Sequence, residues 1–255
     1  MFNLQGKKII ITGASKGLGH VCAKALEKEG AKLVLMARSK DKLEEIRNSF
    51  SRPNEHLSIA VDLTDLNQLR DGIEMAKSFL QDIDVVLHVA GGGLGLKDPL
   101  LSFDDFEKLF ALNFKSAAEI NRLIVPEMME RKKGNLVHVC SIASSEATGS
   151  VGYNTVKAAL AAYVKSLGRE VAKYGVIATG ILPGGFYAPE NSWVRFYSRD
   201  PVGVQNFIKE RLPRGFLGKA EEITPLVLFL CSEQASMMGG CLVPIDAGEG
   251  KSYNI

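Results

Sequence analysis

The sequence lacks the features that mark several large classes of protein. None of its apolar runs approaches the length of about 20 residues that a transmembrane helix needs. A formal net charge of +2 gives no strong field for nucleic acid or an acidic membrane surface, so we expect neither as a partner. No cluster of His, Cys, Asp and Glu has metal-ligand spacing, and we expect no metal.

Cysteine is scarce, and its spacing is uninformative for redox or metal chemistry. The four cysteines have no C-x-x-C pair and stand among apolar neighbours, which predicts reduced thiols in the core. The N-terminus runs directly into an apolar strand at Lys8 and leaves no room for a signal peptide. Together these absences predict a cytoplasmic protein.

The composition is that of an ordinary globular chain. Hydrophobic residues make up 46% and charged residues 24% of the 255 residues, enough to bury a large core. We find no repeat, linker or low-complexity segment, and therefore predict a single domain over residues 1–255.

Short apolar runs alternate with amphipathic stretches along nearly the whole chain. Uniformly apolar strands between helices are typical of a parallel sheet that is covered on both faces, which is an α/β fold. The predicted strands are Lys8–Ile11, Lys32–Ala37, Leu57–Val61, Val85–Val89, Leu136–Cys140, Val176–Leu182 and Cys241–Ile245. The predicted helices are 17–29, 39–50, 65–81, 103–132 (two helices meeting near Asn113), 152–173 and 221–232.

One region departs from this alternation. Residues 183–217 are rich in proline, glycine and aromatic side chains, and we interpret them as an irregular loop. A loop of that length in a compact domain is usually functional, so we predict a substrate lid here. Packing of its aromatic residues on the core is the alternative, and both can hold.

The first strand leads into a glycine-rich turn and then into a helical pattern. The turn reads Thr12-Gly13-Ala14-Ser15-Lys16-Gly17-Leu18-Gly19. Strand, turn and helix N-terminus together form a cradle for phosphate, because glycines admit a close backbone approach and the helix end offers free N–H groups. The spacing is G-x-x-x-G-x-G rather than the commoner G-x-G-x-x-G.

A second motif lies in the predicted helix 152–173. Tyr153 and Lys157 are four residues apart and share one helix face, with Ser141 twelve residues before the tyrosine. An adjacent ammonium stabilises a phenolate, so such a tyrosine can exchange a proton with a carbonyl or alcohol oxygen. A serine hydroxyl nearby can hold the same oxygen. Alone, a Y-x-x-x-K pattern also occurs on ordinary helix surfaces.

Taken together, these motifs resemble the short-chain dehydrogenase/reductase family, and within it the 3-oxoacyl-carrier-protein reductase-like members. The resemblance covers essentially the whole chain. It rests on Thr12–Gly19, Asp62, Ala90-Gly91, Asn113, Ser141, Tyr153, Lys157, Pro183-Gly184 and Ile245-Asp246-Ala247-Gly248, which occur in the family's order. It implies a Rossmann-like, doubly wound sheet of seven parallel strands and hydride transfer between a nicotinamide and a carbonyl/alcohol pair.

The resemblance also implies roles for individual residues. Tyr153 would be the general acid/base, Lys157 would assist it and bind the nicotinamide ribose, Ser141 would orient the substrate oxygen, and Asn113 would hold a relay water. Ser144 and Ser145 are alternatives to Ser141. The expected cofactor contacts are Gly13, Ser15, Lys16, Gly17, Leu18, Gly19, Arg38, Ser39, Asp62, Leu63, Ala90, Gly91, Tyr153, Lys157, Pro183 and Gly184.

The end of the second predicted strand favours NADP(H) over NAD(H). An acidic residue there would bind the adenine ribose hydroxyl, whereas an arginine accommodates a 2′-phosphate. This chain has Arg38-Ser39-Lys40 and no acid before Asp41, with Lys16 as a second cation. By resemblance Asp62 meets the adenine amino group; its alternative is to cap the helix that follows.

Several positions depart from the family pattern. His88-Val89 stands where two asparagines are usual, Thr179 where an asparagine is usual, and Ala188 where a threonine commonly contacts the nicotinamide carboxamide. The gap between Ser141 and Tyr153 is one residue shorter than is common. We expect His88 to be structural, as a lone histidine at a strand end usually is.

The substrate is weakly constrained by the sequence. We predict an NADP(H)-dependent enzyme that reduces a ketone of the 3-oxoacyl type or a related one, either free or carrier-bound. A dehydrogenase or reductase of a sugar or nucleotide-sugar is the alternative, and a non-catalytic NADP-binding sensor is a remote one. By resemblance the protein is a homodimer or homotetramer.

Overall fold

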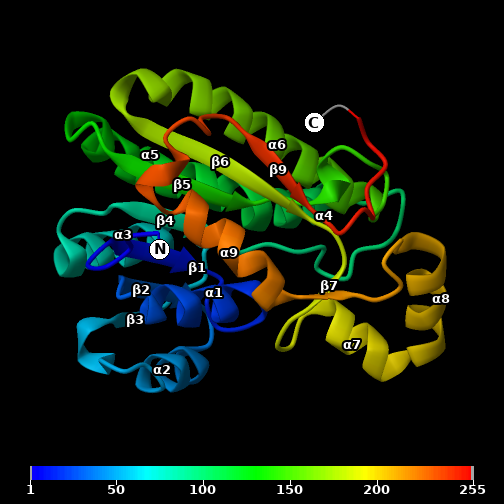
Figure 1. Cartoon of the computed structure of the whole chain (residues 1–255). Helices are drawn as coiled ribbons and strands as arrows, with labels where there is room; N and C mark the ends of the chain where they lie inside the picture. Colours follow the sequence, from blue (N-terminus) through cyan, green and yellow to red (C-terminus); the bar gives the residue numbers. More distant parts are fainter. Residues whose placement is uncertain (1, 254–255) are drawn as a thin grey trace.

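Seven parallel strands form the centre of the computed structural model, which describes residues 2–253 (Figure 1). Their order across the sheet is β3-β2-β1-β4-β5-β6-β9, and every neighbouring pair is parallel. The strands are β1 (Lys8–Thr12), β2 (Lys32–Ala37), β3 (Leu57–Ala60), β4 (Val85–His88), β5 (Gly134–Val139), β6 (Val176–Pro183) and β9 (Leu242–Ile245). The predicted doubly wound parallel sheet is confirmed, and each strand ends within two residues of its predicted bounds.

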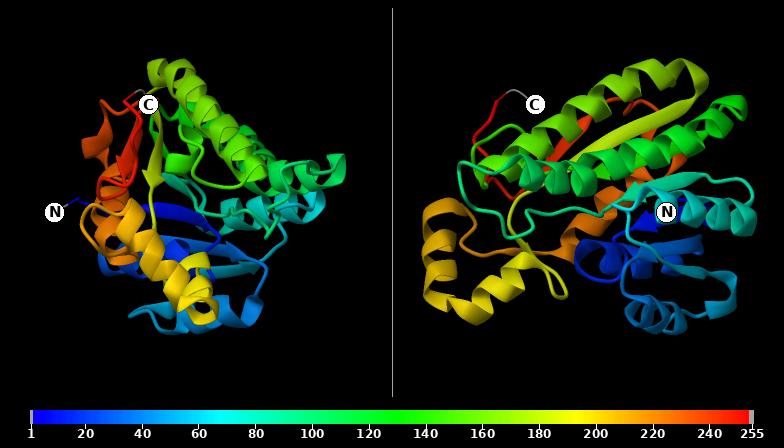
Figure 2. Two further views of the ribbon diagram at one scale, coloured as in Figure 1. Left: turned by 90° about the vertical axis from the view of Figure 1, so that its right-hand side faces the viewer. Right: turned by 180° about the vertical axis from the view of Figure 1, so that it is seen from behind.

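Helices cover both faces of the sheet (Figures 1 and 2). One face carries α1 (Gly17–Lys28), α2 (Lys40–Asn48) and α9 (Ala220–Leu230); the other carries α3 (Leu66–Leu80), α5 (Ser116–Glu130) and α6 (Val151–Val171). Ile9 and Ile11 of β1 belong to the first core and Ile10 to the second, as alternation along a strand requires. Each such fully buried side chain contributes about 1.5–3 kcal/mol to stability.

The strand order reverses at β1, which places a crevice at the carboxyl edge of the sheet. The chain moves outward from β1 to β2 and β3, then returns to the other side of β1 at β4. In open α/β sheets ligands bind at such a switch point, beyond the carboxyl ends of the strands. The glycine-rich turn after β1 and the Ala90-Gly91 segment after β4 therefore flank this crevice.

The predicted junction of two helices near Asn113 is confirmed. Helix α4 spans Phe103–Phe110, a π-helical turn spans Ala111–Lys115, and α5 follows directly. Single π-helical turns inside helices are frequently found at functional sites. The turn buries the Asn113 side chain against the crevice.

The segment 183–217 is more regular than the sequence suggested, so the prediction of an irregular loop was wrong. It contains α7 (Ser192–Arg199) and α8 (Pro201–Arg211), and its short strand β7 (Phe186–Tyr187) pairs with β8 (Gly218–Lys219). Asn191 and Asp200 cap the two helices by accepting from backbone N–H groups. Pro201, which suggested a loop, lies in the first turn of α8, where a proline removes no helical hydrogen bond.

This helical pair projects from one end of the sheet and has a small core of its own (Figures 1 and 2). Val204, Leu212 and Leu217 are buried, and Trp193 and Phe207 pack against them with ring centroids 4.4 Å apart. The aromatic residues therefore serve largely to hold residues 183–217 together. We call these residues the lid segment, after their predicted role.

The four cysteines are free thiols, as predicted; Cys22, Cys140 and Cys231 are buried. Burial raises the pKa of Cys22 to about 12 and of Cys140 to about 11, so neither thiol is ionised near neutral pH. None of the helices within residues 2–253 combines the length and the hydropathy that a membrane crossing requires.

A buried polar network connects the middle strands to the helices that cover them. Asn121 on α5 bonds to His88 Nε2 (2.8 Å), His138 Nε2 (3.1 Å) and the Tyr163 hydroxyl (3.2 Å). His138 Nδ1 lies 3.1 Å from the Thr179 carbonyl, which can only accept; we therefore assign its proton to Nδ1. This network confirms the expected structural role of His88 and uses the Thr179 backbone.

The network predicts a specific loss of stability in acid. Burial lowers the pKa of His88 from 6.5 to about 4. The unfolded chain takes up this proton near pH 6.5 and the folded chain only near pH 4, so the free energy of unfolding falls as the pH drops through that window. The slope from this group alone is about 1.4 kcal/mol per pH unit.

Urea denaturation of the wild type and of His88→Asn across this window tests the prediction. The variant should show the shallower dependence on pH, because it removes one histidine that must stay neutral to remain buried. A control variant, His20→Asn, removes a histidine that is only partly buried and should keep most of the wild-type slope. An unchanged slope in His88→Asn would contradict the assignment.

Candidate functional site

The glycine-rich turn packs tightly against the end of β4. Gly13 has a φ of +67°, and an alanine Cβ there would lie 2.8 Å from the backbone nitrogen of Ala90. A Cβ on Gly19 would lie 2.3 Å from the Gly13 carbonyl oxygen. Thr12 Oγ1 accepts from the backbone N–H groups of Val89 and Ala90 at 3.1 and 3.2 Å, which fixes the two strand ends to each other.

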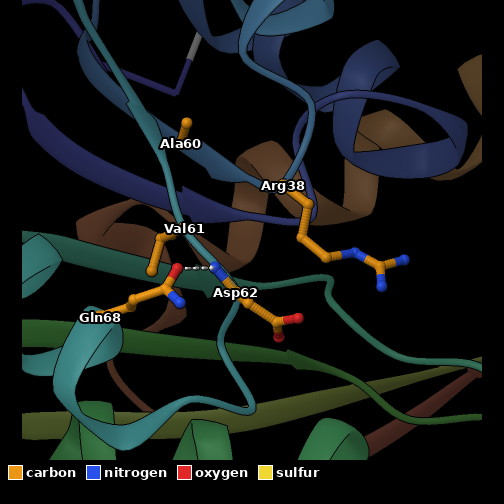
Figure 3. A pocket seen from close by; sticks show the side chains of 5 residues that line it. All are labelled: Arg38, Ala60, Val61, Asp62 and Gln68. Atoms are coloured by element: carbon orange, nitrogen blue, oxygen red, sulfur yellow. Dashed lines mark hydrogen bonds between the residues drawn. The ribbon is translucent and has the colours of Figure 1, made fainter.

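A pocket of about 350 Å³ lies beyond the ends of β2 and β3 (Figure 3). It is lined by Arg38, Ala60, Val61, Asp62 and Gln68. The Arg38 side chain is exposed beside it, and Gln68 Oε1 accepts from the Asp62 backbone N–H at 3.1 Å. The pocket therefore joins the two strand ends at which the sequence predicted recognition of the adenine half of a cofactor.

Asp62 does not cap the following helix. Its Oδ1 accepts from Thr64 Oγ1 at 2.7 Å and from the Thr64 N–H at 2.9 Å, and these bonds lower the pKa of the carboxyl group. Helix α3 is capped instead by Asp65, which accepts from the N–H groups of Asn67 and Gln68. The capping alternative for Asp62 was therefore wrong.

The other predicted cofactor residues lie around the same edge. Lys16 is exposed at the start of α1 and Ser39 at the start of α2, whereas Leu18 is buried beneath the turn. Ser15 lies between Gly13 and Lys16 in the turn, Leu63 is buried after β3, and Pro183 ends β6 with Gly184 following it.

One contact to the glycine-rich turn was not predicted from the sequence. The carbonyl oxygen of Pro189, in the lid segment, accepts from the Gly17 N–H at 2.7 Å. Glu190 also forms an ion pair with Lys42 on α2. The lid segment thus reaches across the glycine-rich turn to the neighbouring helix.

Tyr153 and Lys157 occupy the first turns of α6, as their spacing predicted. Lys157 is only 3% exposed, and its Nζ donates to the Val139 carbonyl at the end of β5 at 2.8 Å. That nitrogen lies 5.8 Å from the centre of the Tyr153 ring. A charge buried this deeply is retained only with close polar partners, so the strand end holds the ammonium in place beside the phenol.

Asn113 is held on the opposite side of the same space. Its Oδ1 accepts from the Gly92 N–H at 2.8 Å, while Nδ2 donates to the carbonyls of Gly92 at 3.0 Å and Leu109 at 2.9 Å. Both amide hydrogens are used, and one lone pair of Oδ1 remains for a further donor such as a water. A Cβ on Gly91 would lie 2.8 Å from Asn113 Oδ1 and 3.2 Å from Lys157 Nζ, so the three groups adjoin.

Ser141 begins a short 3₁₀ turn after β5. Its Oγ accepts from the Ala143 N–H at 3.1 Å, which leaves the hydroxyl hydrogen available for a substrate oxygen. Of the alternatives, the exposed Ser145 donates to the Ile142 carbonyl at 3.3 Å, and the buried Ser144 Oγ has no hydrogen-bond partner among the described residues. Ser144 therefore remains an alternative to Ser141 as the residue that orients the substrate oxygen.

Three arginines of the lid segment have hydrogen-bond or ion-pair partners within it or beside it. Arg214 forms a two-pronged ion pair with Glu222 at 2.8 and 3.0 Å and lies over the Phe216 ring. Arg195 donates to the Glu190 carbonyl, and Arg199 to the Arg195 carbonyl at 3.3 Å. Arg195 and Arg199 thus each use one N–H group within the lid segment, and Arg214 is paired with Glu222 although its Nε has no partner among the described residues.

Two carboxylates near the site were absent from the sequence prediction. Glu249 is only 4% exposed, and Glu146 follows the Ser141 turn; both bond to backbone N–H groups. Their partners are far away in sequence, so no local motif could have shown them. The only signal was a glutamate directly after the Asp246-Ala247-Gly248 turn.

The residues present fit a phosphorylated dinucleotide. The absence of side chains at Gly13 and Gly19 is needed for the turn itself. The Gly17 N–H at the start of α1 donates to the Pro189 carbonyl, so a phosphate bound at this helix end would take the place of that lid-segment oxygen. Arg38 beside its pocket and Lys16 in the turn supply cations that suit a phosphate. Within residues 2–253 no group of His, Cys, Asp and Glu is placed to hold a metal ion.

Comparison with known proteins agrees with this architecture. A family model described as short chain dehydrogenase matches residues 7–195. Gluconate 5-dehydrogenase of Gluconobacter oxydans (strain 621H) is 28% identical over 252 residues, 97% of this chain and 96% of the relative. The structure of L-sorbose reductase from Gluconobacter frateurii, complexed with NADPH and L-sorbose, has a TM-score of 0.90 and 28% identity, covering 99% of this chain and 100% of that one.

A 3-oxoacyl (acyl-carrier-protein) reductase of Agrobacterium tumefaciens C58, solved with NADP bound, has a TM-score of 0.89. Its identity is 24%, over 97% of this chain and 95% of that one, so the likeness speaks for the fold alone.

The crowding at Gly91 predicts a stability difference between two neighbouring glycines. Gly91→Ala should lower the free energy of unfolding by about 1–3 kcal/mol, because its Cβ would press on Asn113 and Lys157. Gly93→Ala is the matched control, since its Cβ would lie 3.7 Å from the Tyr153 ring, an ordinary contact. Urea denaturation of both variants measures the difference; equal stability would contradict the close approach at Gly91.

Proposed function

The chain belongs to the short chain dehydrogenase family, and we propose that it is an NADP(H)-dependent reductase that converts a ketone to the corresponding alcohol. The observation that carries this proposal is the buried Lys157 ammonium, fixed by the Val139 carbonyl one helical turn from Tyr153 and adjoining Gly91 and Asn113. A cation held beside a phenol favours the phenolate, as proton exchange with a carbonyl or alcohol oxygen requires.

The proposed roles follow from the geometry of these side chains. When bound, the nicotinamide supplies the hydride to the substrate carbonyl carbon. Tyr153 donates a proton to the carbonyl oxygen, and Lys157 stabilises the phenolate that remains. Ser141 donates its free hydroxyl hydrogen to the same oxygen, which holds the substrate in line. Asn113 keeps the Gly91-Gly92 backbone beside the lysine and offers one lone pair to a relay water.

We propose that Arg38 and Lys16 select NADP(H) over NAD(H). Arg38 is exposed at the rim of the pocket, at the end of β2, where an acidic residue would bind a ribose diol; the one carboxylate that lines the pocket, Asp62, follows β3 and accepts hydrogen bonds from Thr64. A guanidinium binds phosphate through two parallel hydrogen bonds, which an NAD(H) ribose does not offer. The NADPH in the L-sorbose reductase complex supports the same preference.

For the substrate we favour a polyhydroxy ketone over a 3-oxoacyl thioester. Two relatives that this chain covers almost completely are named for gluconate and L-sorbose. Of the lid-segment arginines, Arg214 is already paired with the Glu222 carboxylate, which removes one cation that a phosphopantetheine arm could use. The acyl thioester remains the second candidate, because the lid segment carries further cationic side chains that could bind its phosphate. We propose that the lid segment closes over either substrate. We also propose that the protein assembles as a homodimer or homotetramer.

Tyr153→Phe tests the assigned proton donor. The variant keeps the ring and loses only the hydroxyl, so we expect NADPH binding to persist and turnover to fall by about 10²–10⁴-fold. Fluorescence titration with NADPH and steady-state rates measure the two quantities separately. Unchanged turnover would show that another group donates the proton.

Arg38→Asp tests the cofactor preference. We expect a 10-fold or larger loss of NADPH affinity, about 1.4 kcal/mol or more, with NADH affinity unchanged or improved. Lys28→Asp is the control, because it reverses an exposed charge at the C-terminal end of α1, away from the glycine-rich turn, and should spare the preference. If Arg38→Asp lowered the affinity for NADPH and NADH equally, the interpretation that Arg38 binds the 2′-phosphate would be wrong.

A further inference from the structure

We propose that the C-terminal clasp, residues 246–252, positions the two loops of the site through Glu249 and Glu146, and that Glu249 is a positioning residue for the reaction. One loop is the Pro183–Gly185 turn after β6; the other is the 141–149 loop between Ser141 and Tyr153. The inference rests on the proposed function for its effect on turnover, but its structural part stands independently.

The first joint ties the clasp to the turn after β6. Glu249 Oε2 accepts from the Gly185 N–H at 2.6 Å, a short bond of the kind that a charged acceptor forms. The contact is close along the whole turn: a Cβ on Gly184 would lie 2.6 Å from Glu249 Oε2 and 2.9 Å from Asp246 Cβ. Only a glycine at position 184 allows the clasp to lie against the turn in this way.

The second joint ties the clasp to the loop that follows Ser141. Glu146 Oε1 accepts from the backbone N–H groups of Lys251 at 2.6 Å and Ser252 at 2.8 Å. The Glu146 N–H in turn donates to the Ile142 carbonyl at 3.1 Å, next to Ser141. Figure 1 shows the red C-terminal segment running beside the green segment that follows β5.

Between the two joints the clasp is ordered by its own hydrogen bonds. Asp246 accepts from the N–H groups of Gly248 at 3.0 Å and Gly250 at 2.9 Å, and the Glu249 N–H donates to the Asp246 carbonyl at 3.1 Å. Such an ordered turn transmits the position of one joint to the other. The clasp therefore sets the spacing between the loop of Ser141 and the loop of Pro183-Gly184.

The burial of a carboxyl group at Glu249, bonded to the Gly185 N–H, argues that this contact is more than packing. A buried carboxylate costs free energy that an apolar side chain would not, and here burial raises its pKa while the Gly185 bond and Arg211 on α8 oppose that shift. Asp246 and Glu146, on the other side, disfavour the charge further. What the carboxylate gains in return is a directional bond to one backbone N–H of the turn.

Replacing Glu249 separates positioning from simple packing. Glu249→Gln keeps an acceptor oxygen for the Gly185 N–H and should retain kcat within a few-fold of wild type. Glu249→Ala removes the acceptor, and we expect kcat to fall by about 10- to 100-fold, as displacement of reacting groups by about 1 Å can cause. The Kd for NADPH should rise by less than kcat falls, because the turn supplies only Pro183 and Gly184 to the cofactor, whereas the Arg38 and Lys16 contacts do not depend on the clasp.

Hydrogen–deuterium exchange gives a readout that needs no turnover. In Glu249→Ala, exchange should rise in the 183–187 segment, and in Glu146→Ala it should rise in the 141–149 loop and the clasp. Glu130→Ala, at an exposed position at the end of α5, should change neither. Thermal denaturation of all variants shows whether they are folded at the temperature of the assay.

The outcomes distinguish the two claims. Suppose that exchange at 183–187 is faster in Glu249→Ala, but that even the wild type reduces no ketone. This result would support the positioning role of the clasp and contradict the proposed function. Ketone reduction in the wild type with unchanged exchange and kcat in Glu249→Ala would overturn the clasp. Equal losses in Glu249→Gln and Glu249→Ala would also overturn it, since the bond to Gly185 would then not be what matters.

Discussion

The site depends on close backbone approach at a few glycines on the carboxyl edge of the sheet. A side chain at Gly13 would strike the Ala90 backbone, one at Gly91 would strike Asn113 and Lys157, and one at Gly184 would strike Asp246 and Glu249. Each contact brings together segments that are distant in the chain. Without them the ends of β1, β4 and β6 would stand farther apart, and the groups they carry would not share one crevice.

The reacting side chains come from helical elements, and backbone groups at the strand ends hold them in position. The ammonium of Lys157 comes from α6 but is held by the last carbonyl of β5, and Asn113 comes from a π-helical turn but is held by the backbone after β4. Each group is thus fixed by an element other than the one that carries it. That arrangement suits chemistry in which proton donor and substrate oxygen must stay within hydrogen-bond distance.

Much of the fold was predictable because its strands are short apolar runs with uniform burial and its helices are amphipathic. The helices α7 and α8 were missed because proline and glycine outweighed a helical pattern that depends on capping by Asn191 and Asp200. Motif spacing predicted Tyr153, Lys157 and the glycine-rich turn. The contacts of Glu249 with Gly185 and of Pro189 with Gly17 were not predictable, since they join residues 64 or more positions apart and no local pattern encodes them.

The most direct test of the central claim uses the unmodified protein. Fluorescence titration with NADPH and NADH, followed by the absorbance of the reduced nicotinamide on addition of L-sorbose or of a 3-oxoacyl thioester, measures cofactor choice and carbonyl reduction in one experiment. We predict tighter binding of NADPH and its oxidation by a ketone, the polyhydroxy ketone being the better substrate. Failure to bind either nucleotide, or tight binding with no oxidation by any carbonyl compound, would contradict an NADP(H)-dependent reductase.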